Sequence, residues 1–272
     1  MKTIIVATDF SDAAENAINY AAEMALQLKA RLILFHAYQI PVAVSEMPIV
    51  YDMEALIADN KRQLDTIKER LQDAKGPALF LQTEVSEGSL IGCLKDICED
   101  MEPYTVVMGC HGTTAAERFF FGSNTVYALK HLHWPIIAVP ANFAFAGIKK
   151  IAFASDLDKD LAKTALALLK NWVTDFMASL HIVNFGKQEQ FYENSVFASG
   201  ALQRELKVLD PQFHFITGEN TEDAITQFVL ANQIDLLVVL HKTYGFFENI
   251  FHKSQTKQFA LYSAIPLLVL HE

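Results

Sequence analysis

The sequence predicts two tandem α/β domains, each a doubly wound, five-stranded parallel sheet with helices on both faces. Two observations carry this prediction. Short apolar runs alternate with helix-like segments along the chain, and the first half of the sequence is repeated in the second. A chain of 272 residues, 51% of them hydrophobic and 20% charged, is large enough to form two cores.

The strands of the first half are predicted from short, β-branched runs that do not alternate between apolar and polar residues. Such runs are typical of strands buried on both faces of a parallel sheet. They are TIIVAT, RLILFHA, YTVVMG and PIIAVP. Helices are predicted at Asp12–Leu28 and Asp52–Ala74, where apolar residues recur at helical spacing. This βαβ order implies right-handed crossovers and a Rossmann-like sheet.

An internal repeat divides the chain into two similar parts. KTIIVATDFSDAAENAINYAAEMALQLKARLILFHA is echoed by KKIAFASDLDKDLAKTALALLKNWVTDFMASLHIVNF, which places Asp9 on Asp156. SEGSLIGCLKDICEDMEPYTVVMG likewise pairs with TGENTEDAITQFVLANQIDLLVVL, and WPIIAVP pairs with IPLLVLH. We therefore predict one domain over residues 1–142 and another over residues 149–272, joined by a short linker.

Composition and charge argue against several classes of protein. A net charge of −10 disfavours nucleic-acid binding, which depends on Lys and Arg. The most apolar stretch, Trp134–Ile148, is too short and too interrupted to span a membrane, and the N-terminus lacks a secretory signal. Cys93, Cys98 and Cys110 fit neither a disulfide framework nor a zinc site. We expect reduced thiols, no metal site and a cytoplasmic location.

The segment most informative about function is VVMGCHGTTAAERFFFGSNTVYALKHLHWPIIAVP, which leaves a strand and enters a helix. Glycines such as Gly109 and Gly112 at the carboxyl end of a strand let a ligand approach the backbone, and helix N-terminal amides favour anions. The segment has neither a Walker A nor a GxGxxG pattern. Spacing alone supports equally a phosphate site and a plain turn followed by a helix that Ser123 caps.

The same segment resembles the universal stress protein family, whose ATP-binding pattern is G-x2-G-x9-G-[ST]. The match falls on Gly109, Gly112, Gly122 and Ser123. The opening IIVATDFSDAAENAINYAAEMA resembles the family's first strand and helix, PIIAVP resembles its last strand, and the resemblance extends over both halves. It implies an adenine nucleotide alpha hydrolase-like fold with strand order 3-2-1-4-5 in each domain.

The resemblance also implies that the first domain binds ATP, with or without Mg²⁺. The ends of the first two strands would line the adenosine, the first two glycines would flank the ribose, and the residues from Gly122 onward would hold the phosphates. The implied residues are Ala7, Asp9, Ala37, Met108, Gly109, Gly112, Gly122, Ser123, Asn124 and Thr125. Alternatively, Asp9 only caps the helix that starts near Ser11.

The second domain departs from this pattern. Its positions equivalent to the three glycines are assigned to His241, Tyr244 and, allowing a one-residue deletion, Lys253. Side chains there would occupy the room that a ribose and phosphates need, so we expect no cofactor in the second domain. A small anion site formed by histidines and lysines of this segment is the less favoured alternative.

These features predict a stress-response protein that senses an adenine nucleotide and has no assigned catalytic residue. One alternative is an enzyme that slowly hydrolyses ATP or phosphorylates itself, with Glu117 and His111 as candidate bases. Another is a scaffold without a nucleotide, or one whose connection AYQIPVAVSEMPIV binds an apolar molecule. Family domains often pair through their final strands, which implies that PIIAVP pairs with PLLVLH within the chain and leaves a homodimer of two chains open.

Overall fold

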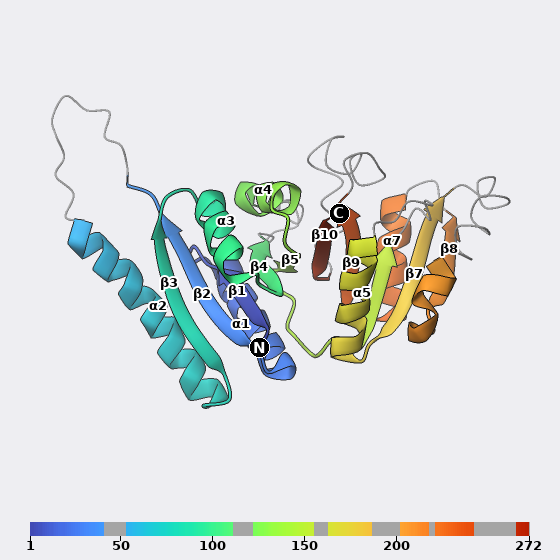
Figure 1. Cartoon of the computed structure of the whole chain (residues 1–272), viewed down its shortest axis with the longest axis horizontal. Coiled ribbons are helices and arrows are strands. Elements are labelled where there is room, and N and C mark those ends of the chain that lie inside the picture. Colours follow the sequence, from blue (N-terminus) through green and yellow to red (C-terminus); the bar gives the residue numbers. More distant parts are fainter. Residues whose placement is uncertain are drawn as a thin grey trace, which may run out of the picture.

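The computed structural model describes residues 1–40, 53–110, 122–154, 163–186, 202–217, 221–241 and 265–271. These residues form one sheet of ten strands in the order β3-β2-β1-β4-β5-β10-β9-β6-β7-β8, with helices on both faces (Figure 1). No helix in these ranges is long and apolar enough to cross a membrane. We refer to residues 1–142 and 149–272 as the first and second halves.

The first half contributes half of the sheet, in which all neighbouring strands are parallel. Its strands are β1 (Thr3–Ala7), β2 (Arg31–Tyr38), β3 (Phe80–Glu87), β4 (Thr105–Cys110) and β5 (Ile136–Pro140). Its helices are α1 (Asp12–Leu28), α2 (Met53–Lys75), α3 (Leu90–Met101) and α4 (Ser123–His131). The order β3-β2-β1-β4-β5 confirms the predicted 3-2-1-4-5 arrangement, and α1 and α2 occupy the two predicted helical segments.

The second half repeats the arrangement in its described residues. Its strands are β6 (Lys150–Ala154), β7 (Ser179–Gly186), β8 (Gln212–Thr217), β9 (Leu236–His241) and β10 (Leu267–His271). It also contains α5 (Lys163–Phe176), the 3-10 helix η2 (Lys207–Leu209) and α7 (Thr221–Asn232). The order β8-β7-β6-β9-β10 is again 3-2-1-4-5, so the predicted fold class is confirmed.

The two halves meet where β5 and β10 pair antiparallel. Ile137 lies opposite Leu268, its own equivalent in the repeat, and the flanking pairs are arranged symmetrically about this one. A two-fold homodimer has the same kind of self-complementary interface. The pairing of PIIAVP with PLLVLH within the chain is therefore present, and the chain resembles two subunits of a dimer joined by a linker.

Further contacts fix the two halves to each other. Asp175 on α5 accepts hydrogen bonds from Lys2 Nζ at 2.6 Å and from the Tyr104 hydroxyl at 3.0 Å. The ring of Tyr104 stacks on Trp172, with 4.7 Å between centroids. On each face of the sheet, a continuous apolar core includes residues of both halves. The junction is therefore built as a protein interior.

Candidate functional site

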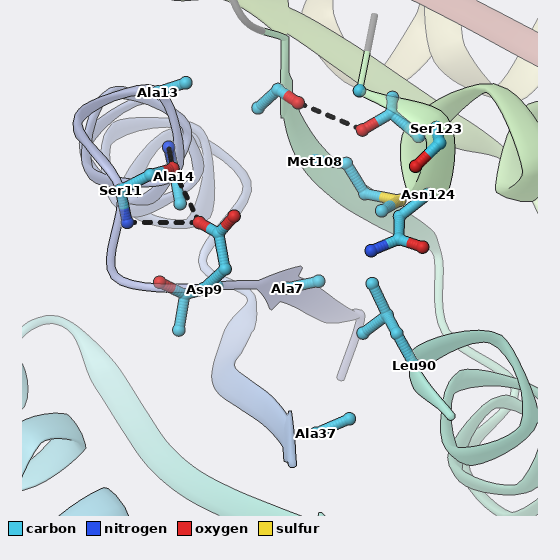
Figure 2. Close-up of a pocket in the computed structure, with 14 residues that line it drawn as sticks. Ala7, Asp9, Ser11, Ala13, Ala14, Ala37, Leu90, Met108, Ser123 and Asn124 are labelled. Carbon is cyan, nitrogen blue, oxygen red and sulfur yellow. Dashed lines mark hydrogen bonds between the residues drawn. The ribbon is translucent and has the colours of Figure 1, made fainter. Parts of the chain in front are cut away.

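A pocket of about 350 Å³ opens at the carboxyl ends of β1 and β4 in the first half (Figure 2). These strands are neighbours in the sheet. After β1 the chain continues to β2 and after β4 it continues to β5, so the two connections run in opposite directions along the strand order. Open α/β sheets bind ligands at such a switch point. The volume is at the lower end of the range of about 300 to 1,000 Å³ that is typical of small-molecule sites.

Every predicted site residue that the structure describes lines this pocket. These residues are Ala7, Asp9, Ala37, Met108, Gly109, Gly122, Ser123, Asn124 and Thr125. Gly112 lies outside the described residues. Lining residues that were not predicted from the sequence are Thr8, Ser11, Ala13, Ala14 and Leu90.

The loop between β1 and α1 presents Asp9 and Ser11 to the pocket. Asp9 Oδ1 accepts hydrogen bonds from the Ser11 backbone N–H at 3.1 Å and from the Ser11 hydroxyl at 2.6 Å. The Ser11 Oγ in turn accepts from the backbone N–H of Ala14 at 3.3 Å. The N-cap of α1 is therefore Ser11, not Asp9, and the Asp9 carboxylate orients the capping hydroxyl.

Other contacts lock the backbone of this loop. The Phe10 N–H donates to Thr8 Oγ1 at 3.0 Å, and His36 Nδ1 donates to the Thr8 carbonyl at 2.8 Å. Phe10 has a left-handed backbone, with φ of 64°, which is unfavourable for a bulky residue. Its ring packs on the ring of His36, with 4.5 Å between centroids. The loop thus holds one conformation at the edge of the pocket.

Gly109, at the end of β4, has no room for a side chain. A Cβ placed there would lie 2.4 Å from the carbonyl oxygen of Ala13 and 2.9 Å from the backbone nitrogen of Ala14. The first turn of α1 therefore packs directly on the backbone of β4. The family resemblance implied that this glycine flanks a ribose. Close packing of the helix on the strand is a separate reason for glycine here, and it needs no ligand.

The N-terminus of helix α4 lies at the pocket, on the side opposite Asp9 (Figure 2). Its first turn contains no acidic residue, so the positive end of the helix dipole is not offset there. Gly122, the N-cap, has φ of −53° and ψ of 148°, which any residue adopts. The backbone does not require glycine at this position, which belongs to the lining of the pocket.

The first residues of α4 differ in their contacts. Ser123 and Asn124 are exposed and lie at the pocket (Figure 2). Thr125 is only 4% exposed, and its hydroxyl donates to the carbonyl of Gly109 at 3.0 Å. Thr125 therefore attaches the first turn of α4 to the end of β4, while Ser123 and Asn124 keep their polar groups toward the pocket.

The remaining wall is apolar. Ala7, Ala37, Leu90 and Met108 line the side of the pocket toward α3 (Figure 2). Among the described lining residues, Asp9 is the one with an ionisable side chain. An apolar slot beside a carboxylate and a helix N-terminus can accommodate a flat ring, a polar group such as a sugar, and an anion.

Comparison with known proteins decides the family. The family model described as "Universal stress protein family" matches residues 1–140. The chain belongs to this family. Universal stress protein Slr1230 of Synechocystis sp. is 26% identical over 296 residues, which cover 98% of this chain and 99% of that protein.

A solved structure of a universal stress protein resembles the chain in fold along nearly its whole length. The universal stress protein from Archaeoglobus fulgidus has a TM-score of 0.75 at 13% identity, and the match covers 99% of this chain and 98% of that chain. Another universal stress protein, solved in complex with cAMP, matches 39% of this chain and 73% of that chain, with 23% identity and a TM-score of 0.30. The full-length matches support the tandem arrangement.

The register of the sheet corrects one sequence assignment in the second half of this universal stress protein. Thr105 pairs with Ile4, and Leu236 pairs with Ile151, the equivalent of Ile4 in the repeat. Gly109 lies as far beyond Thr105 as Leu240 lies beyond Leu236. The equivalent of Gly109 is therefore Leu240.

The assignment of His241 to this position was wrong. The ungapped repeat match already places Gly109 on Leu240, whereas the motif comparison shifted this position by one residue, and the strand pairing decides for Leu240. Leu240 is 4% exposed and belongs to the core, so a buried side chain stands where the first half has glycine. Tyr244 and Lys253, the other predicted replacements, lie outside the described residues.

The sequence also predicted reduced cysteines and assigned no metal site. Cys93, Cys98 and Cys110 are buried free thiols. Burial raises the pKa of Cys98 to about 12 and raises the pKa of Cys110 well above its usual value, so both thiols stay protonated near neutral pH. Within the described ranges, no group of His, Cys, Asp and Glu is arranged to hold a metal ion.

Proposed function

We propose that the first half of this universal stress protein binds an adenine nucleotide, with ATP as the leading candidate, in the pocket at β1 and β4. The observation that carries this proposal is the convergence of the predicted residues. Segments as distant as Ala7, Ala37 and Thr125 line one cavity. Their prediction rested on glycine spacing and family resemblance, and the cavity is an independent observation that supports it.

Successive parts of the pocket suit the adenine, the ribose and the phosphates. The apolar slot formed by Ala7, Ala37 and Leu90 would take the adenine, and the strand ends would take the ribose. The phosphates would lie at the N-terminus of α4, where backbone amides, Ser123 and Asn124 offer donors. Asp9 lies across the pocket from this helix, where its carboxylate is better placed for sugar hydroxyls than for phosphates (Figure 2).

Magnesium would enter the site with the triphosphate. The described lining includes one carboxylate, that of Asp9, and Mg²⁺ in nucleotide sites is commonly held by phosphates, waters and a small number of carboxylates. Binding rather than turnover is proposed, because Asp9 is the one described lining residue that could act as a base and it lies away from the phosphate end. His111 and Glu117, the predicted alternative bases, lie outside the described residues.

The proposed role is regulatory. Occupancy of the pocket would shift the interactions of the protein with its partners and so signal nucleotide levels during stress. We place this role in the cytoplasm, in keeping with three free thiols and the reducing conditions there. The domain bounds 1–142 and 149–272 are part of the proposal and are supported by β5 ending at Pro140 and β6 beginning at Lys150.

Calorimetric titration with ATP tests the proposal. The wild type should release or absorb heat on binding, and Gly122→Leu should weaken binding at least about tenfold, because the leucine fills the phosphate space without adding charge. The matched control is Gln72→Leu on the exposed side of α2, which should bind as the wild type does. Absence of binding by the wild type, or wild-type affinity in Gly122→Leu, would overturn the proposal.

A further inference from the structure

Helix α4 is held at both ends, and the two attachments come from different halves of the chain. At its first turn, Thr125 donates to the carbonyl of Gly109 on β4. Near its last turn, the carbonyl of Leu129 accepts a hydrogen bond from Nε2 of His271 at 3.0 Å. His271 is the last residue of β10 and belongs to the second half. Helix α4, which lines the pocket in the first half, thus also contacts the second half of the chain.

The chemistry of this contact is specific. A carbonyl oxygen only accepts hydrogen bonds, so Nε2 of His271 carries the proton. Leu129 lies among the last four residues of α4, whose carbonyls have no partner within the helix. Both residues are buried, with Leu129 at 0% and His271 at 8% exposure. Removing the imidazole donor would leave a buried carbonyl without this bond, which is unfavourable.

The contact is one-sided. A two-fold interface makes each contact twice, once from each subunit. The repeat places Pro140 of the first half at the position of His271, since WPIIAVP pairs with IPLLVLH. Proline has no side-chain donor, so β5 cannot make the reciprocal bond. The second half therefore supports α4 of the first half in a way that the first half cannot return.

We propose that His271 is a positioning residue for the nucleotide pocket. A helix of nine residues attached at both ends has a fixed direction. By holding the last turn of α4, His271 sets where the first turn, with Ser123 and Asn124, faces the phosphates. The second half is then required for full nucleotide affinity although it lends no residue to the described lining. This inference rests on the proposed function of the pocket.

The test compares three variants of the full chain by calorimetry with ATP and with adenosine. His271→Phe keeps an aromatic ring but removes the donor, and it should weaken ATP binding by about five- to tenfold, the range expected for a lost hydrogen bond. Adenosine binding should change less than about twofold, because adenosine has no phosphate to meet α4. His271→Gln, which retains an amide donor, should recover most of the ATP affinity.

The matched control is Asp175→Asn, which weakens the junction away from α4 by disturbing the contacts of Asp175 with Lys2 and Tyr104. It should lower thermal stability and leave ATP affinity unchanged. Equal losses in Asp175→Asn and His271→Phe would overturn the inference, because any weakening of the junction would then suffice. Unchanged ATP affinity in His271→Phe, or equal losses for ATP and adenosine, would overturn it as well.

Hydrogen exchange of the α4 amides in the protein without nucleotide separates this inference from the proposed function. Exchange should be faster in His271→Phe than in the wild type or in Asp175→Asn. If the wild type binds no ATP, the proposed function fails, whereas unchanged exchange in His271→Phe refutes the role of His271. Should His271→Phe not fold, His271→Asn takes its place, since its shorter amide draws the donor back from Leu129.

Discussion

The two halves of the sheet share strand order and register but differ at the end of one strand. In the first half, Gly109 lets the first turn of α1 pack on the backbone of β4 beside a pocket. In the second half, the equivalent Leu240 places a buried side chain in the core. The fold therefore tolerates either residue, because buried strand interiors specify the sheet, whereas the positions just beyond them decide whether a cavity remains.

The largest effect is expected when the leucine of the second half is removed. Leu240→Ala should lower the free energy of unfolding by about 2 to 5 kcal/mol, because a buried leucine leaves a cavity when truncated. ATP affinity should stay at the wild-type value. Urea unfolding with parallel calorimetry checks both. A loss below about 1 kcal/mol would show that Leu240 is not packed as the register implies.

Adding a side chain at the equivalent position of the first half should weaken ATP binding, unlike the change in the second half. Gly109→Ala should cost about 1 to 3 kcal/mol through overpacking, because the new Cβ would meet the backbone of Ala13. It should also weaken ATP binding, since α1 must move away from β4 at the pocket. The same two measurements apply. Stability and affinity both at wild-type values would remove the steric distinction between Gly109 and Leu240.

A smaller difference between the halves concerns pH. In the second half, Nδ1 of His181 lies 3.0 Å from Nε2 of His214, and the equivalent of His181 in the first half is Ile33. Burial lowers the pKa of both histidines, and the neighbouring His214 and Lys150 lower that of His181 further. The unfolded chain then binds more protons than the folded one as pH falls below the ordinary value of 6.5.

The second half should therefore lose stability below that pH. Urea unfolding at pH 7.5 and pH 5.5 should show a larger loss for the wild type than for His181→Leu, which removes one of the two titrating groups. A matched substitution of the first half, Ile33→Val, should leave the pH dependence of the wild type unchanged. Equal pH dependence in the wild type and His181→Leu would contradict the assignment.

Much of the fold and of the candidate site was predictable from the sequence. Apolar runs and helical spacing predicted the strands and the helices α1 and α2, and the family resemblance implied residues that meet in one pocket. The alanines lining the pocket from α1 could have been inferred, because that helix starts where β1 ends at the switch point. Leu90 carried no local signal, since its place depends on how α3 packs.

The features that the sequence alone did not settle depend on tertiary contacts. Two alignments of the glycine position competed, Leu240 from the ungapped repeat match and His241 from the motif comparison, and the pairing of β9 with β6 decides for Leu240. Likewise, His271 touches Leu129 only because β10 pairs with β5 across the junction. The hydroxyl of Thr125 matched a phosphate-binding pattern, yet the structure shows it bonded to the carbonyl of Gly109. Such roles depend on contacts between distant segments.

The most direct test of a nucleotide site confined to the first half is photo-labelling with an azido-adenosine triphosphate, followed by peptide mapping. Labelled peptides should fall within residues 1–142, and excess ATP should prevent the labelling. Label within residues 149–272, or labelling that excess ATP does not reduce, would contradict a nucleotide site confined to the first half.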